Sequence, residues 1–312
     1  MTYTLTTSAI EPDSYHLWAV DDGAWTYLHD CLLALLRPGD TVIDAGANIG
    51  TVTIPLAAAG ARVIAYECEP ENISFLRAAV ATNRFEDRVE VRGKALWDRP
   101  STLRFAGGSA WGRLSDDGAK RVEATTVDDD IPASQAVKIV KMDVEGAELH
   151  VLRGMQQLIR TQHPDIAFEC NSLALGRIGS SIVGIFAFLQ RFGYRIYRIY
   201  AERRLLRLSG LPQEAPVGDY LATKRHPLLL RLQTNHRVGR MRHRHLVRNV
   251  LRQNKDSWPE NVQLLAIADR LPAAIREDAA VAERLDHAHL RHAGDPLLDV
   301  FRRGNFGPAE EG

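Results

Sequence analysis

Four predicted β-strands end in acidic residues, namely Asp44, Glu67, Asp143 and Glu169. Carboxylates of this kind can bind a ligand, hold a metal ion or take up a proton. A single acid at the end of a strand often caps the helix that follows, but capping does not readily explain four such acids. In open parallel sheets, ligands bind beyond the carboxyl ends of the strands. The four acids therefore predict a ligand site along one edge of a sheet.

The loop after Asp44 narrows the kind of ligand. Residues 41–50 read TVIDAGANIG, an apolar strand followed by small residues. The dinucleotide fingerprint GxGxxG needs a second glycine so that the backbone can approach a pyrophosphate, and that glycine is absent here. The pattern D-x-G-x-N-x-G suits a cofactor that carries a ribose and an amino acid tail. We therefore expect Asp44, Gly46, Asn48 and Gly50 to bind such a cofactor, although Asn48 could instead serve only a left-handed turn.

Glu67 ends the next predicted strand and is expected to bind the ribose. An ionised carboxylate only accepts hydrogen bonds, so Glu67 can accept two from a ribose diol. A nucleoside cofactor with an amino acid tail is S-adenosylmethionine. We expect this cofactor to lie between the loop and Glu67, with Asp143 also in contact with it.

Apolar periodicity predicts that strands and helices alternate along the chain. The expected strands are 41–46, 62–67, 88–96, 136–143, 165–169, 194–200 and 219–223, and the expected helices are 25–36, one from 51, 70–83, 147–160 and 182–192. This alternation is typical of parallel βαβ units. The predicted fold class is α/β, with a doubly wound, mostly parallel sheet of the Rossmann-like, seven-stranded type and an antiparallel end.

The composition of the chain excludes a disordered protein and limits the compartment in which it works. The chain has 312 residues and 45% hydrophobic content, enough for a full core. Lys+Arg and Asp+Glu both number 39, so no overall field favours nucleic acid. Three widely spaced cysteines favour a reducing compartment, and no run of about 18 apolar residues or leader pattern occurs. We expect a cytoplasmic protein.

Three segments resemble the FkbM family of class I methyltransferases. They are GDTVIDAGANIG (39–50), VIAYECEPENISFLRAAVATN (63–83) and VKIVKMDVEGAELHVLRGM (137–155). The third is the most specific, because K-[IM]-D-V-E-G-A-E before a leucine-rich helix is the signature of that family. The resemblance covers about residues 15–224. It departs from the family at Cys68, where a proline is usual, and near Asn171, where a histidine is frequent.

The resemblance implies transfer of a methyl group from S-adenosylmethionine to a hydroxyl of a sugar, glycosylated or natural-product acceptor. We expect no nucleic acid partner. An alcohol becomes a good nucleophile when it loses its proton or binds a metal ion. We expect Asp143 first, then Glu145 and Glu169, to act as a general base or as oxygen ligands of Mg²⁺. Glu148 is a further acid, for which a structural role in the first turn of a helix is favoured.

Other functions remain open within this fold. The acceptor could be a nitrogen atom, a protein, a nucleic acid or a lipid-linked group. No Asn-Pro-Pro-Tyr or Asp-Pro-Pro-Tyr motif of N-methylating enzymes follows the fourth strand. A catalytically silent cofactor-binding scaffold is also possible, because a fold does not fix a function. Asp44, Glu67 and the DVEGAE segment argue against a silent scaffold.

The chain is expected to divide into a methyltransferase domain, residues 1–224, and a basic, mainly helical extension, residues 225–312. The segment 224–255 has ten Lys/Arg and no Asp or Glu. Its apolar residues fall near helical spacing, which favours a basic amphipathic helix. Packing on the domain or in a homodimer is the simpler interpretation, and contact with anionic lipid or a phosphorylated acceptor is the alternative.

Overall fold

The computed structural model describes Leu5 and residues 26–106, 113–114, 118–200, 204–208, 218–225 and 233–234. The chain divides into two units, residues 1–235 and 236–312, and the second lies outside the described residues. Most of the basic segment 224–255 also lies outside them, so its interpretation and the expected domain boundary stay predictions.

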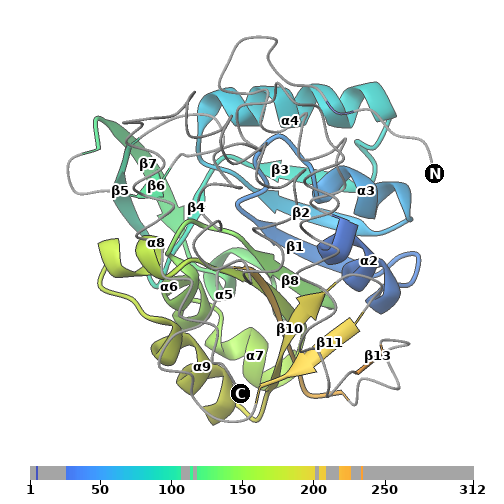
Figure 1. Cartoon of the computed structure of the whole chain (residues 1–312). Coiled ribbons are helices and arrows are strands. Elements are labelled where there is room, and N and C mark those ends of the chain that lie inside the picture. Colours follow the sequence, from blue (N-terminus) through green and yellow to red (C-terminus); the bar gives the residue numbers. More distant parts are fainter. Residues whose placement is uncertain are drawn as a thin grey trace, which may run out of the picture. The chain divides into compact units, whose positions relative to one another are not determined.

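One large sheet forms the centre of the described unit (Figure 1). Its strands are β1 (Thr41–Ala45), β2 (Arg62–Tyr66), β3 (Val89–Arg92), β8 (Ile139–Met142), β9 (Asp165–Cys170), β10 (Arg195–Tyr200), β11 (Arg204–Arg207), β12 (Gly218–Thr223) and β13 (Gln233–Thr234). They lie in the order β13-β11-β10-β12-β9-β8-β1-β2-β3. The strands from β9 to β3 run parallel, and β12 is antiparallel to both of its neighbours.

Helices cover both faces of this sheet (Figure 1). On one face lie α2 (Thr26–Leu35), α3 (Thr53–Ala58) and α4 (Pro70–Asn83), and on the other α5 (Val127–Asp130), α6 (Glu148–Arg153), α7 (Gln156–Gln162), α8 (Ser172–Arg177) and α9 (Ile182–Arg191). Every residue of β1 and β8 is buried, as expected for parallel strands covered on both faces. Among the described helices, none has the length and apolar character to cross a membrane.

The predicted fold class is confirmed, and all seven predicted strands are present. Two predictions of continuous elements were wrong. The segment 88–96 divides into β3 and β4 (Ala95–Leu96), and the helix over 147–160 divides into α6 and α7. Gly154 lies at the second break, where an added Cβ would come within 2.1 Å of the Trp97 carbonyl oxygen. This tight tertiary contact is invisible in the apolar periodicity.

A second, four-stranded sheet was not predicted. It contains β4, β5 (Ser101–Ala106), β6 (Arg113–Leu114) and β7 (Lys120–Thr125), in the order β4-β7-β5-β6. The outer strands are short, and many of the side chains of β5 and β7 are exposed. Strands with so little buried surface leave a weak periodic pattern in the sequence.

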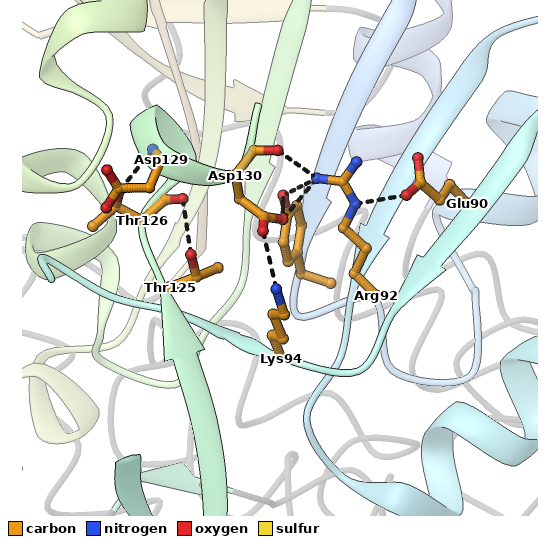
Figure 2. Close-up of polar contacts among 8 residues, drawn as sticks. Glu90, Arg92, Lys94, Thr125, Thr126, Asp129 and Asp130 are labelled. Carbon is orange, nitrogen blue, oxygen red and sulfur yellow. Dashed lines mark hydrogen bonds and ion pairs between the residues drawn. The ribbon is translucent and has the colours of Figure 1, made fainter. Parts of the chain in front are cut away.

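An ionic network fixes the end of β2 that leads to Glu67. The Tyr66 hydroxyl donates to Asp130 Oδ2 at 2.7 Å, and Arg92 Nη1 donates to the same oxygen at 2.7 Å. Lys94 donates to Asp130 Oδ1 at 3.0 Å, and Glu90 accepts from Arg92 Nε at 2.8 Å (Figure 2). Burial alone would raise the pKa of Asp130, but these hydrogen bonds hold it below its usual range. The network joins β2, β3 and α5.

Candidate active site

Sheet register brings acids from three strands into one row. Glu169 of β9 pairs with Asp219 of β12, and Met142 pairs with Phe168, so that Asp143 comes next beside Glu169. Residues paired across strands present their side chains on the same face of a sheet. We call Asp143, Glu169 and Asp219 the carboxylate row, and it lies at the C-terminal ends of β8 and β9.

Glu145 adds a fourth acid from the turn after β8, where its backbone is left-handed with φ +52°. Carboxylate oxygens of Asp143, Glu145 and Glu169 all lie within 4.8 Å of one another. Such spacing allows two oxygens to share a proton or several to bind a divalent cation. The three predicted catalytic residues are therefore brought together.

Burial and neighbouring carboxylates raise the pKa of three of these acids, Glu145, Glu169 and Asp219. Burial, with the neighbouring charge of Asp143, raises the pKa of Glu145 to about 8. Burial and then the charges of Asp143 and Glu145 raise the pKa of Glu169 well above its usual range. Desolvation and Asp143 raise the pKa of Asp219 to about 7, while Lys141 opposes this shift. The cluster therefore holds protons near neutral pH.

The loop that follows β1 satisfies its own backbone donors. The N–H groups of residues 46–50 all donate within the protein, to the Tyr66 carbonyl, Glu67 Oε2, Asn48 Oδ1 and the Ala47 carbonyl, at 2.7 to 3.0 Å. A phosphate cradle needs backbone N–H groups that point at the ligand. The loop therefore does not offer a pyrophosphate site, in agreement with the missing glycine of the dinucleotide fingerprint.

Left-handed backbone at Gly46, Asn48 and Gly50 shapes this loop, with φ of +73°, +51° and +98°. A Cβ on Gly46 would lie 1.8 Å from the Asp143 carbonyl oxygen, so only glycine lets the loop approach the end of β8. A Cβ on Gly50 would lie 2.8 Å from Leu76 of α4. The turn conformation considered for Asn48 is present, and contacts of these three residues with a cofactor stay predictions.

Glu67 is buried directly behind the loop, with 8% of its surface exposed. Its Oε1 accepts from the Cys68 and Glu69 N–H groups at 2.9 and 2.8 Å, and its Oε2 accepts from the Asn48 N–H at 2.8 Å. Burial raises the pKa of Glu67, and the three N–H donors oppose this shift. A carboxylate oxygen can accept two hydrogen bonds, so Oε2 retains capacity for a ribose hydroxyl.

Asp44 lies beneath the loop, fully buried on β1. Its Oδ2 accepts from the Thr53 hydroxyl at 2.6 Å, and its Oδ1 lies 3.2 Å from Lys141 Nζ. The carboxylate therefore orders the start of α3 and holds a buried cation. Its predicted effect on cofactor binding would act through these neighbours.

Sequence reasoning missed Lys141 and Asp219 as members of the site. Lys141 stands within the VKIVKMD segment, two residues before Asp143 on the same strand, and that spacing was an available signal. Asp219 is recognisable only from the register of β12 against β9. Glu148 is buried and its Oε1 accepts from the Val144 and Gly146 N–H groups at 3.2 and 3.3 Å, which agrees with the structural role favoured for it.

Comparison with known families decides the class of protein. Residues 44–196 match the model of a family described as the methyltransferase FkbM domain. The chain carries an FkbM methyltransferase domain. The predicted family and enzyme class are thereby confirmed, and this class of methyltransferase implies S-adenosylmethionine as the methyl donor.

Individual relatives are distant from this FkbM chain. A tRNA (guanine(37)-N(1))-methyltransferase of Danio rerio is 33% identical over 61 residues, which are 20% of this chain and 13% of that protein. A solved structure of methyltransferase FkbM from Methylobacillus flagellatus KT is 19% identical to this chain and has a TM-score of 0.40. The match covers 68% of this chain and 55% of the solved chain. A putative rRNA methylase from Clostridium thermocellum is 14% identical and has a TM-score of 0.41. This match covers 63% of our chain and 92% of the solved one. The chain thus spans a small part of the curated relative and about half of the first of these structures.

Proposed function

We propose that this FkbM domain transfers a methyl group from S-adenosylmethionine to a hydroxyl group of a sugar, glycosylated or natural-product acceptor. The observation that carries the proposal is the carboxylate row beside Glu145, close to the loop after β1. Acids that hold protons near neutral pH suit a reaction in which an alcohol must lose its proton.

The described residues fit the cofactor. Glu67 Oε2 has capacity for a ribose hydroxyl, and the loop 46–50 presents no phosphate cradle, as a nucleoside without a pyrophosphate requires. The cofactor, when bound, supplies a methyl group on a positively charged sulfur. Each carboxylate of the row that is ionised would favour that sulfonium through its negative charge.

Asp143 is the proposed general base. Its side chain is 21% exposed, so it remains open to an acceptor, and the neighbouring Glu169 and Asp219 can accept hydrogen bonds from further hydroxyl groups. Asp143 would take the proton of the reacting hydroxyl as the hydroxyl oxygen bonds to the methyl carbon. The carbon–sulfur bond would break at the same time, and its electron pair would leave with S-adenosylhomocysteine. Carboxyl groups of this kind can form hydrogen bonds with hydroxyl groups in either protonation state, which favours a neutral, hydroxyl-rich acceptor.

The test is the Asp143→Asn variant with S-adenosylmethionine and a panel of glycosides, hydroxylated natural products and amines, followed by mass spectrometry. Asparagine keeps the shape but takes up no proton, so methyl transfer should fall by about 10² or more. Binding of S-adenosylhomocysteine, measured by calorimetry, should stay within about threefold. Asp87→Asn, at an exposed position outside the site, is the matched control and should change neither quantity.

Metal dependence separates the two roles that Asp143 can have. Unchanged activity after treatment with EDTA would support the general base, and activity that is lost and then restored by Mg²⁺ would assign the oxygens to a cation. Wild-type turnover in Asp143→Asn would make the assignment wrong and leave Glu145 or Glu169 as the candidate. Transfer only to amines would contradict O-methylation, and transfer to no acceptor would support a silent scaffold.

A further inference from the structure

Lys141 is a buried cation between the carboxylate row and the loop 46–50, which we call the cofactor loop after its proposed role. Its side chain is 4% exposed. Its Nζ donates to the Gly46 carbonyl oxygen at 3.0 Å, and it lies 3.2 Å from Asp44 Oδ1 and 3.8 Å from Asp143 Oδ2. One ammonium group thus faces the loop, the strand β1 beneath it and the proposed base.

The ammonium group of Lys141 needs its oxygen partners because it is buried. A buried charge is tolerated only when it is paired and hydrogen-bonded. Burial alone would lower the pKa of Lys141, but Asp44 and Asp143 outweigh burial and hold it above its usual range. The side chain therefore stays charged at neutral pH. Its Nζ donates one hydrogen bond, to the Gly46 carbonyl, and forms ion pairs with the carboxylates of Asp44 and Asp143.

We propose that Lys141 is a positioning residue that fastens the cofactor loop to the end of β8, so that residues 46–50 and the turn after Met142 move as one unit. Two other contacts join the same segments. The Asp143 N–H donates to the Ala45 carbonyl at 3.0 Å, and Gly46 lies against the Asp143 carbonyl. The proposal rests on the function proposed above, because it makes cofactor affinity depend on a donor at position 141.

Two double variants test the donor without leaving a buried charge unpaired. Asp44→Asn with Lys141→Met and Asp44→Asn with Lys141→Gln each remove one cation and one anion, so the net charge of the site, which still contains Asp143, does not change. Met and Gln have side chains of equal length. Only glutamine can still donate toward the Gly46 carbonyl. Lys138→Met, just before the start of the same strand, is the control for loss of a lysine.

The readout is S-adenosylhomocysteine affinity by calorimetry, with thermal melting to show that each variant is folded. We expect the double variant with Lys141→Met, the methionine pair, to bind at least tenfold more weakly than the wild type. The double variant with Lys141→Gln, the glutamine pair, should bind at least threefold more tightly than the methionine pair. The Lys138→Met variant should bind within twofold of the wild type. Equal affinities in the two folded pairs would overturn the proposal. Absence of binding in the wild type would instead overturn the function on which it rests.

Native-state hydrogen exchange of the wild type tests the same proposal if the methionine pair does not fold. Segments that move as one unit open with a single free energy. The amides of residues 46–50 and the Asp143 amide should therefore share one opening free energy and respond alike to denaturant. Loop amides that open independently of the Asp143 amide would show that Lys141 does not fasten the two segments.

Discussion

Glu67 holds backbone N–H groups of the loop after β1, and we propose that it also binds the ribose of the cofactor. Its carboxylate holds three backbone N–H groups that shape the loop and the start of α4, and one lone pair at Oε2 is left over. The two roles depend on each other, because the hydrogen bonds that shape the loop also fix the position of the carboxylate. A substitution at this position should therefore change stability and cofactor affinity together.

The Glu67→Gln variant is expected to bind S-adenosylhomocysteine at least tenfold more weakly. The amide group replaces one acceptor oxygen by a donor that faces backbone N–H groups, which should also cost about 1–3 kcal/mol of stability. Calorimetry and urea unfolding measure the two effects. Glu71→Gln, at an exposed position in the first turn of α4, is the control and should alter neither. Unchanged affinity in Glu67→Gln would remove this residue from the cofactor site.

At the scale of elements, the network around Asp130 links β2 to β3 and α5 through side chains (Figure 2). Tyr66 is 1% exposed, so its hydroxyl depends on a protein partner. Its carbonyl oxygen also accepts the Gly46 and Ala47 N–H groups. The network therefore holds in place the residue, Tyr66, to which the loop 46–50 is hydrogen-bonded.

Asp130→Ala should destabilise the domain by about 1–3 kcal/mol, because it leaves the buried Tyr66 hydroxyl and the Arg92 guanidinium without their shared acceptor. Glu90→Ala removes only the exposed partner of Arg92 and should cost less than about 0.5 kcal/mol. Urea unfolding of both variants gives the comparison. Equal losses in the two variants would mean that Asp130 contributes no more than an exposed ion pair.

Some of the helices and strands were predictable from the sequence, and others were not. The helix predicted over 70–83 has the bounds of α4, because Pro70 starts it and Arg84 ends it in a left-handed conformation. The acids at the strand ends were also predictable, since alternation and strand order bring them to one edge. The break at Gly154 and the pairing of Asp219 with Glu169 were not, because each depends on a contact between segments far apart in the sequence.

At the scale of the whole molecule, the acid cluster should make stability depend on pH. Burial raises the pKa of Glu148 to about 7, and burial with Asp143 raises that of Glu145 to about 8. In this range the unfolded chain has already released protons that the folded chain still binds, so stability falls as pH rises. The lowered pKa of the buried His29 acts in the opposite direction only below about pH 6.5.

We expect the free energy of unfolding of the ligand-free protein to decrease from pH 6.5 to 8, by up to about 1.4 kcal/mol per pH unit for each such carboxyl group. Urea unfolding at constant ionic strength measures the slope. Glu148→Gln, which carries no titrating group, should give a flatter profile. A stability that increases across this range would contradict the raised pKa values.

The loop after β1 has a kinetic consequence. Because the N–H groups of residues 46–50 have partners before any ligand arrives, the loop does not need to refold around its cofactor. Little conformational entropy is then lost on association, and encounter should lead directly to the bound state. Substitutions that loosen the loop should therefore appear as faster release of the cofactor, with the association rate nearly unchanged.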